Sequence, residues 1–198
     1  MASVARPKQQ IKKQVRVLGI DDAPFDKFNP LQRQVLVIGT VYRGGDYMDG
    51  VLSTYVEKDG IDATMKIVEM VNACKFKSQL QAIFLNGISV AGFNVINLPK
   101  LHELTSIPVI AVVRDYPNFE EFYGAMEKLQ MTEKMAWVKK LPKPVKAEKV
   151  YIQPVGISLP KATELLKICT SHAEVPECLR IAHIIASGLV DGESRGRA

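Results

Sequence analysis

The sequence predicts a mixed α/β fold in which three antiparallel strands precede α/β crossovers and helices flank one sheet. Three extended apolar segments joined by short turns occupy residues 15–57, as expected for an antiparallel meander. After residue 60 the apolar residues switch to helical spacing, and strands then alternate with helices. Crossovers between parallel strands are right-handed and cover apolar strand faces, so helices are expected on both faces of the sheet.

The first half of the chain carries the meander and the first crossover. A glycine-rich turn at 43–46 separates the second and third strands, and a proline-containing surface segment at 23–34 separates the first and second. Asp59 or Asp62 is placed to cap the helix that follows. We expect strands at 15–20, 35–42 and 47–57, a helix at 61–74 and a short buried strand at 82–85.

The second half adds a central strand and the remaining helices. Residues 107–113 are apolar throughout, which is typical of a parallel strand that is covered on both faces. A helix at 118–129 extends into the segment 133–149, which then unravels through prolines into a lysine-rich loop. The other expected elements are a short helix capped by Asn97, a strand at 150–158, and proline-opened helices at 160–170 and 176–188.

This order of elements is the ribonuclease H-like arrangement. No internal repeat or linker divides the chain, so residues 15–198 are expected to form a single domain after a basic, flexible leader at 1–14. A content of 47% hydrophobic and 24% charged residues excludes a disordered chain. No apolar stretch approaches the roughly 20 residues of a membrane span. No signal-peptide pattern follows the basic N-terminus, so we expect a cytoplasmic protein with no membrane partner.

The basic excess of the chain lies in its leader. The formal net charge is +5, and the first sixteen residues hold five basic and no acidic side chains, which leaves the rest of the chain neutral. A uniformly basic surface for nucleic acid is therefore not indicated. We interpret the leader, with Lys12 and Lys13, as an electrostatic arm that contacts nucleic acid.

Two adjacent carboxylates follow the first strand. Asp21 and Asp22 stand at its C-terminal end, where an α/β sheet usually presents ligand-binding groups. Hydrolysis of a phosphodiester needs oxygen ligands that hold Mg²⁺, and Asp21 is the natural first ligand. In the alternative interpretation, both aspartates cap the turn before Pro24. The sequence leaves these two interpretations open.

Further ligands would come from neighbouring elements. Asp62, with Asp59, flanks the start of the first helix, where an N-cap or turn role is the alternative to catalysis. Asn86 ends the next strand and can offer a carbonyl oxygen to a metal, but it carries no charge. His183 has the apolar neighbours of a partly buried structural histidine, although a histidine can also shuttle protons. Arg195 and Arg197 either belong to a mobile tail or grip phosphates.

Four sequence blocks stand out, at residues 19–22, residues 59–64, residues 86–88 with 91–94, and residues 192–197. Together they resemble a small, mainly archaeal family of uncharacterised proteins, domain of unknown function ninety-nine. This family is similar in fold to endonuclease V, a Mg²⁺-dependent nuclease that cleaves nucleic acid near deaminated bases. The resemblance implies that Asp21 matches the first-strand aspartate of that enzyme and that Asn86 replaces its second aspartate.

The sequence leads to two main hypotheses for the function. In the first, the protein is an endonuclease V-like, metal-dependent nuclease in which Asp21, Asp22, Asp62 and Asn86 are catalytic, Asp21 and Asn86 hold Mg²⁺, and catalysis is weakened by the amide. In the second, it is a non-catalytic module on the same fold that binds nucleic acid or protein. A small-molecule enzyme that uses the same end of the sheet is a third alternative.

Overall fold

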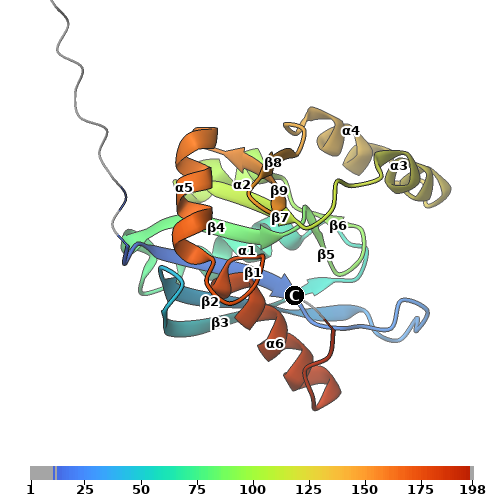
Figure 1. The fold of residues 1–198 in the computed structure, drawn as a ribbon. Helices are drawn as coiled ribbons and strands as arrows, with labels where there is room; N and C mark the ends of the chain where they lie inside the picture. The colour runs from blue at the N-terminus through green and yellow to red at the C-terminus, as the bar shows by residue number, and fades with distance from the viewer. Residues whose placement is uncertain (1–10, 12, 197–198) are drawn as a thin grey trace, which may run out of the picture.

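A computed structural model describes residues 11 and 13–196, which form a seven-stranded mixed sheet with helices on both faces (Figure 1). The strand order is β3-β2-β1-β4-β7-β9-β8. β1 pairs antiparallel with β2 and parallel with β4, β4 pairs parallel with β7, and β9 runs antiparallel to both β7 and β8. The strands are β1 (Arg16–Asp22), β2 (Gln34–Arg43), β3 (Tyr47–Glu57), β4 (Leu80–Asn86), β7 (Val109–Val113), β8 (Val145–Ala147) and β9 (Val150–Val155).

The expected meander is confirmed. β2 pairs antiparallel with β1 along the whole of β1, and its other edge pairs with β3. The turn between β2 and β3 contains Gly44, whose φ of 56° lies in the left-handed region that glycine adopts readily. The continuous apolar runs of β1 and β2 are buried because helices or loops cover both faces of the sheet.

Two pairs of helices enclose the sheet. α1 (Ala63–Asn72) and α2 (Leu98–Thr105) pack on one face, where their apolar residues join the largest hydrophobic cluster. α5 (Leu159–Cys169) and α6 (Glu177–Asp191) pack on the other face and complete a second cluster. Figure 1 shows α5 and α6 together on the near side of the sheet. Asn97 caps α2 as expected, since its Oδ1 accepts a hydrogen bond from the backbone N–H of Lys100 at 3.0 Å.

Two further helices lie at the periphery. α3 (Phe119–Lys128) and α4 (Thr132–Lys140) pack on a two-stranded hairpin made of β5 (Ser89–Val90) and β6 (Asn94–Val95). A short 3₁₀ turn at Lys77–Gln79 precedes β4. The buried Lys134 of α4 donates hydrogen bonds from Nζ to the carbonyl oxygens of Asp59 and Phe93. Lys134 thus links α4 to the turn between β3 and α1 and to the β5–β6 hairpin.

The structure corrects the interpretation of residues 130–158. The segment expected to prolong α3 is a separate helix, because Gln130 adopts a φ of 57° between α3 and α4. The lysine-rich segment expected as a loop contains the edge strand β8, which pairs with β9 and buries Ala147. A strand of three residues carries too little periodicity to be recognised from sequence.

α6 begins in direct contact with β1. There is no room for a side chain at Gly19, where a Cβ would lie 2.4 Å from the carbonyl carbon of Cys178. Thr40 of β2 donates a hydrogen bond from Oγ1 to the carbonyl oxygen of Cys178 at 2.6 Å. The start of α6 is thus fixed against β1, two residues before the aspartate pair.

None of the helices within the described residues is both long enough and apolar enough to cross a membrane.

Candidate active site

Asp21 is the centre of a polar cluster at the carboxyl end of β1. Its side chain is buried, with only 3% of the residue surface exposed. Its Oδ1 accepts hydrogen bonds from Nδ2 of Asn86 at 3.1 Å and from the backbone N–H of Asp22 at 3.0 Å. Its Oδ2 lies 3.0 Å from Nδ1 of His183. A carboxylate removed from water is stable only with such partners, and here three groups supply them.

The topology explains how these residues meet. β1 and β4 are parallel, and their register pairs Ile20 with Leu85, so the next residue of each strand emerges at the same edge of the sheet. The contact between Asp21 and Asn86 could therefore be predicted from the sequence. His183 comes from α6, which the close approach at Gly19 holds over β1.

His183 was expected to be a structural histidine, and the structure places it against Asp21. Its Nε2 lies 3.3 Å from the carbonyl oxygen of Arg195. Both ring nitrogens thus face oxygen acceptors, an arrangement that the doubly protonated imidazolium satisfies. The hydrogen bond to Asp21 raises the pKa of His183 above its usual value, although burial and the nearby charge of Arg114 lower it.

Asp22 projects to the other side of β1, as alternation along a strand requires. Its Oδ2 accepts a hydrogen bond from the backbone N–H of Ala91 at 2.7 Å, which ties β1 to the β5–β6 hairpin. Burial, followed by the charge of Asp21, raises the pKa of Asp22 to about 6, while the hydrogen bond from Ala91 and the charge of His183 lower it. The carboxylate of Asp22 therefore bonds the hairpin rather than the turn before Pro24.

Asp62 is not among the partners of Asp21. Its carboxylate accepts hydrogen bonds from the backbone N–H of Glu57 at 3.1 Å and from Nδ2 of Asn94 at 2.6 Å. It occupies the N-cap position of α1 but makes no side-chain cap bond. Asp59 likewise binds the hairpin, through the backbone N–H of Phe93. Both acids fasten the β3–α1 turn to the β5–β6 hairpin, so the expected capping bonds are not formed.

Of the four basic residues assigned to nucleic acid, the structure describes Lys13 and Arg195, and these two lie apart. Lys12 and Arg197 lie outside the described residues. Lys13 is exposed just before β1, at the end opposite Asp21, and a seven-residue strand spans roughly 20 Å. Arg195 is exposed in the segment that follows α6, where its carbonyl oxygen contacts His183.

A cleft of about 400 Å³ is lined in part by His183. Three arginines, Arg114, Arg180 and Arg195, line it together with the histidine. Neither Arg114 nor Arg180 was anticipated, because nothing in their local sequence distinguishes them from surface arginines. Only the fold brings the residue after β7 and one face of α6 to the same cleft.

The cluster offers few ligands for a metal ion. Across residues 11 and 13–196, no three or more His, Cys, Asp or Glu side chains are grouped so that they could hold one. The oxygen donors at the centre are the carboxylate of Asp21 and the amide oxygen of Asn86. His183 is engaged by Asp21 through one ring nitrogen.

Comparison of the chain with known proteins shows its family. A family model described as endonuclease dU matches residues 13–190. The chain is 44% identical to a UPF0215 protein of Methanothermobacter thermautotrophicus, over 96% of this chain and 95% of that one. It is 40% identical to a UPF0215 protein of Methanopyrus kandleri, over 96% of this chain and 98% of that one.

Solved structures show the same fold. A protein of unknown function from Archaeoglobus fulgidus is 37% identical and superposes with a TM-score of 0.82, covering 88% of this chain and 98% of that one. Endonuclease V of Ciona intestinalis, in complex with a DNA containing an inosine followed by a ribo-adenosine, is 18% identical with a TM-score of 0.58, covering 88% and 85%. The fold is therefore a mixed α/β fold similar to that of endonuclease V, and the chain belongs to the endonuclease dU family.

Proposed function

We propose that this protein is a metal-dependent endonuclease with a ribonuclease H-like core that cleaves nucleic acid at a deaminated base such as deoxyuridine. The observation that carries the proposal is the buried carboxylate of Asp21, which is contacted by Asn86 from β4 and by His183 from α6. The family description and the likeness in fold to endonuclease V support the same reaction class.

A Mg²⁺ ion at this centre would be held weakly, because few side chains there can bind it. Mg²⁺ usually keeps several waters and is bound through one or two carboxylates together with substrate phosphates. Asp21 would supply the carboxylate and Asn86 the amide oxygen, with a phosphate of the substrate as a further ligand. When bound, the ion would neutralise developing charge and make a bound water more acidic. Asn86 in place of a second carboxylate lowers the charge of this donor set and weakens the site.

The residues around the centre have separate tasks. Asp21 fixes the orientation of the His183 ring through Nδ1 and stabilises its protonated form. The Nε2 proton faces the carbonyl oxygen of Arg195 at 3.3 Å, beside the cleft lined by arginines, and it can be given to a leaving oxygen of a substrate that displaces this contact. Asp22 follows Asp21 in the chain but holds the β5–β6 hairpin, and its raised pKa reflects burial and then the charge of Asp21.

A cleavage assay tests the proposal. Labelled oligonucleotides that differ only in one position, carrying deoxyuridine, deoxyinosine or an undamaged base, are incubated with Mg²⁺, Mn²⁺ or a chelator. We expect metal-dependent cutting of a deaminated substrate and its loss in Asp21→Ala. The matched control is Asp46→Ala, which removes an exposed carboxylate from the turn between β2 and β3. Cutting that survives in Asp21→Ala would overturn the assignment.

A non-catalytic binding module is the second candidate, and one observation favours it. Asn86 donates its amide hydrogen to Asp21, so the carboxylate is already hydrogen-bonded by protein groups on both oxygens. In that case the wild-type protein binds oligonucleotides with every metal and cuts none. Binding that weakens on removal of residues 1–14, and weakens with added salt, would place the basic leader in the same interaction.

A further inference from the structure

The cleft beside His183 has the composition of an anion site. It lies between the end of β7, α6, the loop before α6 and the segment that follows α6. Its lining holds three arginines, Arg114, Arg180 and Arg195, and one acidic residue, Glu174, whose carboxylate is half exposed. Arg195 also pairs with Glu193 at 3.4 Å, and both of these side chains are exposed. The lining is therefore cationic on balance. Guanidinium groups match phosphate in geometry as well as charge.

Arg180 is held in place by a buried carboxylate. Glu177 is only 2% exposed, and its Oε2 accepts hydrogen bonds from Nε and Nη2 of Arg180 at 2.9 and 2.6 Å. Its Oε1 accepts a hydrogen bond from the backbone N–H of His172 at 3.0 Å. A guanidinium has five N–H donors, so the pairing with one carboxylate oxygen leaves donors of Arg180 for a ligand in the cleft.

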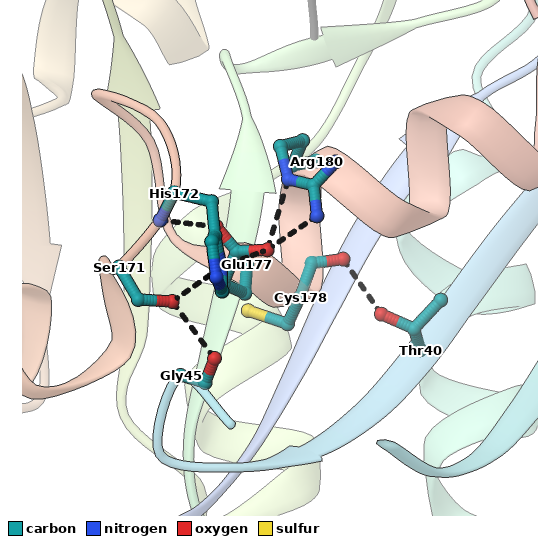
Figure 2. A network of polar contacts seen from close by, with 7 residues as sticks. All are labelled: Thr40, Gly45, Ser171, His172, Glu177, Cys178 and Arg180. Carbon is teal, nitrogen blue, oxygen red and sulfur yellow. Dashed lines mark hydrogen bonds and ion pairs between the residues drawn. The ribbon is translucent and has the colours of Figure 1, made fainter. Parts of the chain in front are cut away.

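Figure 2 shows how this pair is anchored to the rest of the molecule. Ser171, which lies beside His172, donates a hydrogen bond from Oγ to the carbonyl oxygen of Gly45 at 2.9 Å. Thr40 binds the carbonyl oxygen of Cys178, directly after Glu177. The start of α6 is therefore tied both to the β2–β3 turn and to β2. A guanidinium fixed in this way loses little freedom on binding an anion.

The position of Arg180 links the cleft to the catalytic centre. Arg180 and His183 are three residues apart on α6, so they share one face of the helix. His183 in turn contacts Asp21. An anion held by Arg180 would thus lie one helical turn from the residue that touches the central carboxylate.

From this arrangement we infer that the cleft binds an internal phosphodiester of a nucleic-acid strand, next to the one at Asp21, and that Glu177 is a positioning residue for Arg180. The inference rests on the proposed function. It adds a phosphate subsite with named residues to the substrate class. The expected ligand is a phosphate of a continuous strand rather than a free phosphate ion.

The test measures binding without cleavage. The affinity of a fluorescent oligonucleotide that lacks terminal phosphates and damaged bases is measured by anisotropy, in chelator, over a series of salt concentrations. Arg180→Gln should weaken binding about tenfold and lower the salt slope by about one, as for a lost phosphate contact. Lys66→Gln removes an exposed positive charge from α1, on the other face of the sheet, and should match the wild-type protein.

The Glu177→Gln variant tests whether Glu177 acts by fixing Arg180 or only through its negative charge. Removing a negative charge near the cleft would by itself strengthen the binding of a polyanion, whereas loss of the fixed guanidinium weakens it. We therefore expect weaker binding and a lower salt slope in Glu177→Gln, with a circular dichroism spectrum like that of the wild-type protein. Stronger or unchanged binding in a folded Glu177→Gln would overturn the positioning role. If that variant does not fold, Arg180→Gln decides the inference alone.

Inorganic phosphate distinguishes the two sources of the anion. The subsite for a strand predicts that Arg180→Gln lowers oligonucleotide affinity and that inorganic phosphate competes only weakly. Equal oligonucleotide affinity in Arg180→Gln and Lys66→Gln would overturn the inference, as would thermal stabilisation by inorganic phosphate that depends on Arg180 while strand binding does not. Because neither metal nor a damaged base is present, these results do not depend on whether the protein cuts deoxyuridine.

Discussion

Substitution of Gly19 by alanine should displace α6 and thereby lower both the stability and the activity of the protein. A Cβ at Gly19 would lie 2.4 Å from the carbonyl carbon of Cys178 and 2.6 Å from the backbone nitrogen of Leu179. Ordinary contacts of a Cβ begin at 3.4 Å, so α6 must move by about 1 Å. Overpacking of this kind costs about 1–3 kcal/mol of unfolding free energy. The same shift moves His183 away from Asp21, and a misplacement of about 1 Å in a catalytic group can cost roughly 100-fold in rate.

Gly39→Ala is the matched control. Gly39 lies opposite Ile20 in the neighbouring strand, but a Cβ there would meet only side-chain atoms, of Leu18, Leu52 and Met70, at 3.2–3.4 Å. These atoms can shift, so we expect a loss of less than about 1.5 kcal/mol. Urea denaturation gives the free energies, and the cleavage assay gives the rates. A Gly19→Ala protein as stable and as active as Gly39→Ala would refute the reasoning.

Three other substitutions probe separate parts of the structure. Asn86→Asp places a second carboxylate about 3 Å from Asp21; thermal unfolding should show lower stability in chelator and a larger stabilisation by Mg²⁺ than in the wild-type protein. Asp49→Asn removes a carboxylate that bridges two arginines; burial alone raises the pKa of Asp49, but hydrogen bonds from both arginines hold it below 3.8. The stabilisation by Asp49 is therefore present above pH 3.8 and is lost as the pH falls through the lowered pKa. Urea denaturation should show that Asp49→Asn loses about 1.5–3 kcal/mol of unfolding free energy at neutral pH and less in acid. Lys134→Met leaves two carbonyl oxygens without their donor, and should cost about 1–3 kcal/mol and speed amide hydrogen exchange in the β5–β6 hairpin.

The longer strands and most helices could be predicted because their signals are local, whereas the two-residue strands β5 and β6 were not predicted. The apolar runs of β1, β2 and β7 and the Asn97 cap of α2 are readable within a few residues. β8 could not be predicted, because three residues that are stabilised by pairing with β9 carry no periodicity of their own. The capping role expected for Asp62 failed for a related reason, since Asn94 on a distant hairpin competes for its carboxylate.

The contacts of the candidate site also differ in how far the sequence predicts them. The contact between Asp21 and Asn86 follows from two parallel strands that end at one edge of the sheet, so strand order alone predicts it. The contact of His183 with Asp21 joins residues 162 positions apart and depends on how closely α6 approaches β1. The sequence signal for that approach is Gly19, a glycine inside an apolar strand, which indicates that another backbone lies close.

The most direct test of the account is a double-mutant cycle on the cleavage of one duplex with a single deoxyuridine. Rates are measured for the wild-type protein, Asp21→Asn, His183→Gln and the double variant, with oligonucleotide binding as the control for folding. If both residues act as one unit, each single variant loses about 10²–10⁴-fold in rate and the double variant loses no more than the worse single one. A wild-type protein that binds the duplex without cutting it, or single losses that multiply in the double variant, would contradict the account.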